Sequence, residues 1–355
     1  MEKKHKYLSF ALILAVIVLA HLVAVKLFFS DDTPVASEPN VDSTLSSQSH
    51  DAPPPLSAVK PPLSTLRTKK KFMLNYRYAT RNKINGLATG EATTGILVDL
   101  DSGYVLWEKN SRKSVPIASM TKMMTLLVAF EAIEQRPDIS LDSMVTVSRA
   151  AANIGGTQVW LAKGEKFTLR DLMKTMMLRS ANDSAYMVGE YLGNGDIHQF
   201  VAKMNSRAQA MNMGGTVFYN PNGLPEVKNN VSTPEALTRM AFELLKRPQA
   251  MTWASTRKGS FRDKSSKAYQ ILINTNKLLG SCPGVDGLKT GFINAAGSCI
   301  TVTCKRGGRR LVAVVTGFKS WRSRNAFIRK LLNWGYKRSH EVDLLAKKHR
   351  VIQSN

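Results

Sequence analysis

Histidine, the usual base in serine hydrolases, is scarce in this sequence. There are six histidines in 355 residues, and only His198 lies in the part that we expect to fold. A Ser-His-Asp triad could therefore use only this one histidine, and a histidine-rich metal site would lack its ligands. If a serine acts as a nucleophile in this protein, a lysine is the available base.

Acidic residues are also few, with 26 Asp and Glu against 50 Lys and Arg and a net charge of +24. Such a balance suits contact with anionic membranes, envelope polymers or nucleic acid. The basic excess is densest at residues 305–310 and 322–330, but it contains no aromatic-interleaved motif of the kind that binds single strands. We interpret it as a solvated basic surface and expect no nucleic-acid partner.

Cysteine is limited to Cys282, Cys299 and Cys304, with no C-x-x-C pair. This pattern argues against a zinc or iron-sulfur site, and we expect neither a metal nor an organic cofactor. Cys299 and Cys304 are five residues apart in a strand-like run, so their side chains should point to opposite faces. We expect buried, unreactive thiols, while a disulfide from Cys282 to one of the other two stays open if the domain is exported.

The N-terminus carries Lys3, Lys4 and Lys6, followed by an apolar run from Tyr7 to Phe29. About 20 apolar residues span a bilayer. A cleaved signal peptide has a shorter core and a small-x-small exit, which is missing near residues 25–30. We therefore predict that residues 1–30 form a cytoplasmic basic tip and a transmembrane signal anchor in the inner membrane, with the remainder on the periplasmic side. Cleavage of this segment is the alternative.

Residues 31–85 are rich in serine and proline, and we predict a disordered tether. The folded domain is expected over 86–338, followed by a basic tail at 339–355. Strands are expected at 95–100, 104–109, 297–304 and 310–316. Helices are expected at 119–134, from Thr168 onward with Asp171 as its capping partner, and at 324–336. This order indicates an α+β domain with an antiparallel sheet, built from both chain ends and flanked by helices.

Three short motifs could carry chemistry. The first is Ser-Met-Thr-Lys at 119–122, at the start of a predicted helix. Lys122 lies one turn after Ser119 and shares its face, so its amine can reach the hydroxyl. The helix dipole and burial should both lower the pKa of Lys122, which allows a neutral amine to act as base.

The other two motifs are Ser-Ala-Asn at 180–182 and Lys-Thr-Gly at 289–291. Ser180 is expected at the end of a methionine-rich helix, with its hydroxyl in a cleft wall where it could relay a proton. Asn182 could bond both a lysine and a substrate amide. Lys289 is expected to be an exposed lysine at a sheet edge that holds a substrate carboxylate. The N–H after Gly291, that of Phe292, could form an oxyanion hole with the N–H of Ser119.

Together these motifs resemble the penicillin-recognising serine enzymes. Residues 115–122, 178–183, 220–224 and 284–291 are similar to the D-alanyl-D-alanine carboxypeptidases, the low-molecular-mass penicillin-binding proteins. The resemblance covers about residues 93–338. It implies a β-lactamase/DD-peptidase-like fold with a mainly helical subdomain, no cofactor, and a peptidoglycan stem pentapeptide as substrate.

The resemblance also implies a role for each residue. Ser119 would form the acyl-enzyme with the penultimate D-alanine and Lys122 would accept its proton. Ser180 would relay a proton to the leaving D-alanine. The substrate-binding residues would be Asn182, Lys289, Thr290, Gly291 and Phe292, and β-lactam antibiotics would acylate Ser119 as substrate mimics.

Two departures from the family pattern and several alternatives bear on this interpretation. Residues 339–355 are too few for the all-β domain that many members carry, so the N-terminal span would anchor the protein. Phe292 stands where many members have histidine, which alters a side chain of the substrate pocket.

A DD-endopeptidase that cuts cross-links uses the same residues. A β-lactamase would need a Glu-x-x-Leu-Asn segment, which is absent between Asn182 and Lys289. A catalytically silent envelope-binding module would not need the intact motifs.

Overall fold

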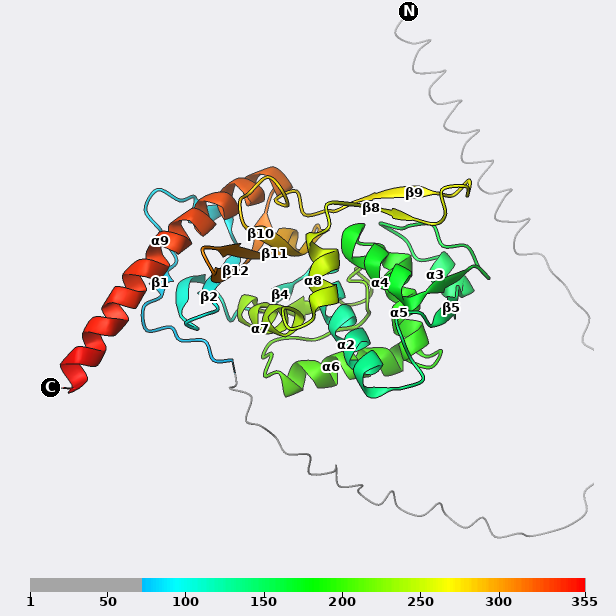
Figure 1. Cartoon of the computed structure of the whole chain (residues 1–355), viewed down its shortest axis with the longest axis horizontal. Coiled ribbons are helices and arrows are strands. Elements are labelled where there is room, and N and C mark those ends of the chain that lie inside the picture. The colour runs from blue at the N-terminus through cyan, green and yellow to red at the C-terminus, as the bar shows by residue number, and fades with distance from the viewer. Residues whose placement is uncertain (1–71, 355) are drawn as a thin grey trace, which may run out of the picture. The chain divides into compact units, whose positions relative to one another are not determined.

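A six-stranded sheet forms the centre of the protein, in a computed structural model that describes residues 72–354. The strand order is β1–β3–β2–β12–β11–β10, and every neighbouring pair is antiparallel except β1 with β3. The early strands β2 and β3 thus join the late strands β10 to β12 in one sheet, as predicted (Figure 1). The strand bounds are Thr80–Arg81 (β1), Thr94–Asp99 (β2), Val105–Lys109 (β3), Val285–Ile293 (β10), Gly297–Arg306 (β11) and Arg309–Phe318 (β12).

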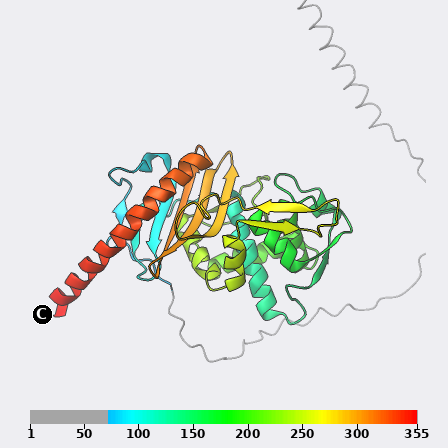
Figure 2. The same ribbon diagram turned by 45° about the horizontal axis from the view of Figure 1, so that its top comes forward.

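Both faces of this sheet are covered, which explains why every residue of β2 is buried. Alternating side chains enter two separate cores: Ile96 packs with the helical side and Leu97 with the opposite side. Helix α7 (Pro234–Leu244) and helix α8 (Pro248–Ser255) pack on the first face, and α9 (Trp321–Ser354) crosses the second (Figure 2).

A mainly helical region lies beside the sheet, as the family resemblance implied (Figure 1). Its central helix α2 (Lys122–Gln135) is buried over its first nine residues. A helix surrounded by other elements needs no polar face, so apolar residues occur around most of its circumference. Helices α4 (Leu169–Leu178), α5 (Asn182–Leu192) and α6 (Ile197–Ala210) pack on α2, and the short helix α3 (Arg149–Ala152) packs on α5.

Short elements connect these layers. Three small two-stranded sheets are formed by β4 with β7, β5 with β6, and β8 with β9. The bounds are Val115–Pro116 (β4), Met144–Thr146 (β5), Lys166–Thr168 (β6), Val231–Ser232 (β7), Lys258–Phe261 (β8) and Gln270–Ile273 (β9), with 3-10 turns at Thr89–Glu91 (η1) and Ala118–Thr121 (η2).

The start of α4 confirms the predicted capping pair. The Thr168 Oγ1 atom accepts the Asp171 N–H at 3.1 Å and donates to the Asp171 carboxylate at 2.8 Å. The side chain of Thr168 thereby satisfies one of the N–H groups that a helix leaves free at its first turn.

The folded region is longer at both ends than predicted. Phe72 stacks on Phe242 with ring centroids 4.3 Å apart, and Ile84 is buried, so residues 72–85 belong to the folded domain and not to a tether. At the other end α9 continues through the expected tail to Ser354, because Val342 still packs into the core and Asp343 pairs with Arg309. Isolated apolar residues among polar ones carried too little signal for either extension to be predicted.

The predicted membrane anchor at residues 1–30 lies outside the described residues. Between residues 72 and 354, no helix is both long and apolar enough to cross a bilayer. All three cysteines are buried and free, so the disulfide left open by the sequence is not formed. Cys299 and Cys304 belong to the two different cores, which confirms that they point to opposite faces.

The packing of α9 on the sheet can be tested at Phe327. Its ring contacts Trp107 edge-on at 5.8 Å and Phe318 at 5.3 Å between centroids. We expect Phe327→Ala to lower the free energy of unfolding by about 3–5 kcal/mol, since the cavity cannot close. Leu344→Ala, on an exposed part of the same helix, should change it by less than about 0.5 kcal/mol. Equal effects in denaturant titrations would contradict this packing.

Candidate active site

A cleft of about 680 Å³ lies between the β10 edge of the sheet and the helical region. Five of the eight predicted site residues line it: Ser119, Ser180, Thr290, Gly291 and Phe292. The other three are buried close by: Lys122, Asn182 and Lys289. The fold therefore brings together three motifs that lie far apart in the sequence.

Ser119 and Lys122 form a direct contact. Ser119 lies in the 3-10 turn η2, and α2 begins at Lys122, so the predicted helix start is a tighter turn. The Lys122 Nζ atom lies 3.0 Å from Ser119 Oγ, as the spacing in sequence predicts. This is the geometry of a nucleophile beside its base.

The surroundings of Lys122 favour its neutral amine. Lys122 is fully buried, and its Nζ donates to Asn182 Oδ1 at 2.6 Å and to the main-chain oxygen of Asn222 at 2.5 Å. Burial lowers the pKa of Lys122 well below the ordinary value, and the charge of Lys289 lowers it further. A neutral amine has two N–H groups for these two oxygens, which leaves its lone pair for the proton of Ser119.

The loop at residues 220–224 contributes a function that the sequence did not reveal. In the sequence this motif supports only the family resemblance, whereas in the structure the main-chain oxygen of Asn222 accepts from Lys122. The next residue, Gly223, has φ +84°, and a Cβ there would lie 2.1 Å from the oxygen of Ala118. Only glycine allows this loop to pack directly under the serine turn.

Ser180 and Lys289 form a second serine–lysine pair. Ser180 does not end a helix as predicted: it lies between α4 and α5 with a left-handed φ of +67°. Its Oγ accepts from Lys289 Nζ at 2.9 Å. The predicted exposed lysine is wrong, since Lys289 is 1% exposed, and burial lowers its pKa to about 7. It points inward because its place in the strand directs it toward the helical side.

Asn182 uses both ends of its amide within the protein. Oδ1 accepts from Lys122, Nδ2 donates to the Gly155 oxygen at 2.9 Å, and the main-chain N–H donates to the Thr157 oxygen at 2.7 Å. In this arrangement Asn182 orients Lys122 and holds the loop before it. The predicted contact with a substrate amide would require Nδ2 to leave Gly155.

Strand β10 forms the opposite wall of the cleft. A Cβ at Gly291 would lie 2.8 Å from the oxygen of Ile117, so glycine lets the strand approach the serine turn. Thr290 donates to the Thr275 hydroxyl at 2.8 Å, and Phe292, 63% exposed, projects at the cleft. The two N–H groups predicted as oxyanion donors belong to Ser119 and Phe292, which both line this cleft.

Arg324 is a site residue that the sequence analysis missed. It lines the cleft, is 2% exposed, and donates to Ser298 Oγ at 3.1 Å and to the Cys299 oxygen at 2.9 Å. Burial lowers its pKa to about 10, so it stays charged at neutral pH, and it forms no ion pair within residues 72–354. A signal was present, because Arg324 shares a helix face with the apolar residues Phe327 and Ile328.

This arrangement is suited to acyl transfer from a substrate that carries a carboxylate. A serine hydroxyl lies beside a buried amine, and two cationic side chains, Lys289 and Arg324, lie under the same cleft. Among the described residues, no group of three or more His, Cys, Asp or Glu side chains could hold a metal ion.

Comparison with known proteins gives the family. A sequence profile described as D-alanyl-D-alanine carboxypeptidase matches residues 78–320. The chain is 35% identical over 262 residues to D-alanyl-D-alanine carboxypeptidase DacF of Bacillus subtilis, covering 74% of this chain and 66% of that protein. It is 28% identical over 218 residues to the D-alanyl-D-alanine endopeptidase of Pseudomonas aeruginosa, covering 61% and 67%. The chain thus spans about two-thirds of the length of these curated relatives.

Among solved structures, penicillin-binding protein D2 of Listeria monocytogenes in its ampicillin-bound form is similar, with a TM-score of 0.62 and 30% identity. The match covers 69% of this chain and 97% of that one. The predicted DD-peptidase fold is therefore confirmed. Since the profile covers most of the described residues and all three motifs meet in one cleft, the chain belongs to the D-alanyl-D-alanine carboxypeptidase family of serine peptidases.

Proposed function

We propose that this protein removes the terminal D-alanine from peptidoglycan stem pentapeptides through an acyl-enzyme on Ser119. The observation that carries the proposal is the 3.0 Å contact between Ser119 Oγ and the amine of Lys122, which is buried and lacks a carboxylate partner within residues 72–354. A lysine in that position is the base that the scarcity of histidine requires.

The reaction then follows from the positions of these groups. Ser119 Oγ attacks the carbonyl carbon of the penultimate D-alanine while its proton passes to Lys122 Nζ. The C–N bond breaks, and the leaving amine receives the proton of Lys122 through Ser180, whose hydroxyl lines the cleft, so that Lys122 is neutral again. Lys122 then takes a proton from the water that attacks the ester and gives it to Ser119 Oγ as the shortened peptide leaves.

A free carboxylate on the substrate favours carboxypeptidase activity. Arg324 places a positive charge at the cleft and Lys289 adds a second when it is protonated, with no acidic partner for either within residues 72–354. The terminal D-alanine offers the one carboxylate next to the scissile bond. Cleavage of cross-links is the second candidate, favoured by the similarity to the Pseudomonas endopeptidase.

Covalent trapping tests the nucleophile. The solved relative with ampicillin bound supports β-lactams as acylating inhibitors of this chain. We expect a fluorescent penicillin to label the wild type and not Ser119→Ala, measured by in-gel fluorescence and intact mass. Ser111→Ala, which removes a buried hydroxyl outside the cleft, is the control and should label normally. Labelling that persists in Ser119→Ala would refute the mechanism.

The substrate is tested with the same preparations. Free D-alanine from a pentapeptide stem indicates the carboxypeptidase, while cleavage of a cross-linked dimer alone indicates the endopeptidase.

The pH dependence of acylation tests the role of Lys122. Because the base must be neutral, the rate should rise with pH as Lys122 loses its proton, at a pH below that of an ordinary lysine. The charge of Lys289 lowers the pKa of Lys122. Lys289→Met should therefore move the rising limb of the pH–rate profile to higher pH and slow acylation at pH 7 at least about tenfold.

Stopped-flow measurements with a chromogenic β-lactam give the profile. Thr290→Val, which keeps the charge of Lys289, is the control and should leave the limb in place. If Lys289→Met also leaves it unchanged, the limb does not belong to Lys122.

We also propose that residues 1–30 anchor the enzyme to the inner membrane, with the catalytic domain in the periplasm. The lysines before the apolar run and Asp31-Asp32 after it support this orientation. The intact mass of the protein purified from membranes should correspond to a chain that begins at residue 1 or 2. A mature N-terminus beyond Phe29 would instead mean a cleaved signal peptide.

A further inference from the structure

Trp160 is an aromatic residue that the proposed reaction does not use. Its indole is 71% exposed, whereas its neighbours Val159 and Leu161 are buried. Its φ is +58°, a left-handed conformation that costs a non-glycine residue about 1–3 kcal/mol. The chain thus holds its backbone in an unfavourable conformation that leaves a large apolar side chain in water.

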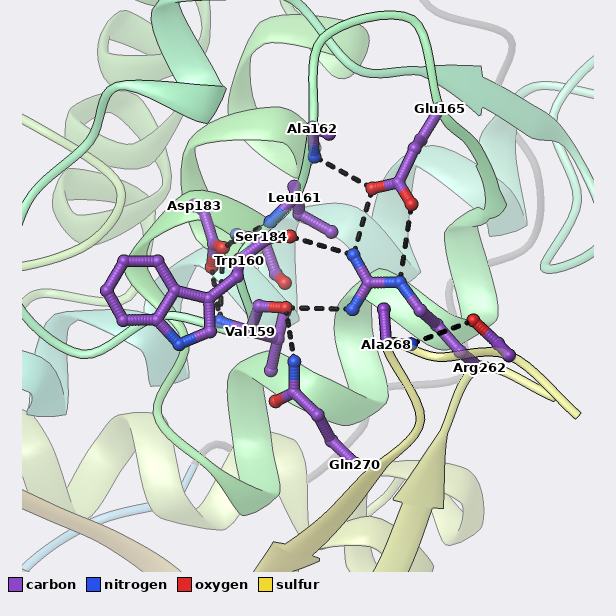
Figure 3. A network of polar contacts seen from close by, with 11 residues as sticks. Val159, Trp160, Leu161, Ala162, Glu165, Asp183, Ser184, Arg262, Ala268 and Gln270 are labelled. Carbon is purple, nitrogen blue, oxygen red and sulfur yellow. Dashed lines mark hydrogen bonds and ion pairs between the residues drawn. The ribbon is translucent and has the colours of Figure 1, made fainter. Parts of the chain in front are cut away.

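Buried charged groups hold this conformation in place. The Asp183 carboxylate accepts the N–H groups of Val159 and Leu161, both at 3.1 Å through Oδ2. From the other side, Arg262 donates to the oxygens of Val159 and Trp160 at 2.9 and 2.8 Å. Figure 3 shows these contacts on both sides of Trp160, with the indole directed away from Arg262.

Two further contacts fix Arg262 and its partner loop. The Arg262 side chain is 6% exposed and pairs with Glu165 at 2.9 Å, and Gln270 adds a second donor to the Val159 oxygen at 2.8 Å. Each of these side chains bonds either to main-chain groups of the loop or to another of the side chains. They therefore fix the position of the indole and leave its surface exposed.

The loop that carries Trp160 is continuous with the wall of the cleft. Thr157 lines the cleft together with Ser119, and its oxygen accepts the N–H of Asn182. Asp183, which holds the Trp160 backbone, is the next residue after Asn182. The Cα atom of Trp160 therefore lies at most about 10 Å from that of Thr157 at the edge of the cleft, on a loop that these contacts hold in place.

We propose that Trp160 is a substrate-binding residue that stacks on an N-acetylated sugar of the glycan strand to which the stem peptide is attached. This inference rests on the proposed function. In an extended stem, the acylated D-alanine and the three residues before it span about 13–14 Å, which is longer than the distance from the cleft edge at Thr157 to Trp160. The sugar can thus reach the indole while the peptide occupies the cleft.

The surroundings of Trp160 favour a sugar over a wholly apolar partner. The exposed residues that follow it are Ala162, Lys163 and Gly164, which do not extend the apolar surface of the indole. An apolar partner would need a contiguous apolar patch. A pyranose ring presents an apolar C–H face with a rim of hydroxyl and amide groups, which matches a single indole with polar groups beside it.

The test compares two substrates that differ only in the sugar. D-alanine release is measured for full-length wild type and Trp160→Ala with a free pentapeptide and with the disaccharide pentapeptide. We expect Trp160→Ala to lower kcat/KM for the disaccharide substrate about tenfold, through KM, and to change kcat/KM for the free peptide less than twofold. Trp160→Tyr, which keeps a stacking face, should restore most of the loss.

Two control variants separate the outcomes. Met144→Ala, another exposed apolar side chain, should leave both substrates unaffected. Gln270→Ala, which loosens the loop but keeps the indole, should raise KM for the disaccharide substrate alone. Equal loss on both substrates with normal penicillin acylation would mean that Trp160 contacts the peptide, and no loss on either would exclude a binding role. Both results overturn this proposal, whereas a wild type that releases no D-alanine from either substrate overturns the proposed function instead.

Discussion

The rest of the site depends on one constraint, the burial of the Lys122 amine beside Ser119 without a carboxylate to pair with it among the described residues. An unpaired ammonium in a protein interior costs several kcal/mol, so this lysine gives up its proton more readily than one in water. Asn182 and Asn222 then accept its two N–H groups, and the lone pair faces the serine. The second lysine, Lys289, strengthens the effect through its charge.

Such burial requires main-chain segments to pack directly against one another. Gly223 and Gly291 allow this from two sides, because a Cβ at either position would collide with main-chain oxygens of Ala118 or Ile117. The serine turn is thus held between a loop and a sheet edge. Thr157, which lines the cleft, belongs to the loop that Asp183 and Arg262 hold in place, and Asp183 directly follows the site residue Asn182.

The strands predicted from local patterns occur in the structure as β2, β3 and the hairpin of β11 and β12, and so does the cap at Thr168. Expectations failed where the outcome depended on contacts distant in sequence. Lys289 was expected at the surface because lysine usually is, yet the helical region covers it. Residues 72–85 and the end of α9 fold because they find apolar partners far along the chain, which a composition of mixed polar residues does not reveal.

The sequence alone determined the type of chemistry, since the three motifs and the scarcity of histidine leave a lysine as the base for a serine nucleophile. Spacing within one turn of chain also determined that Lys122 reaches Ser119. Only the tertiary structure decided that Lys289 is buried against Ser180, that Asn222 and Arg324 belong to the site, and that Trp160 is exposed. Burial and charge at each of these positions come from segments that are distant in sequence and meet only when the chain folds.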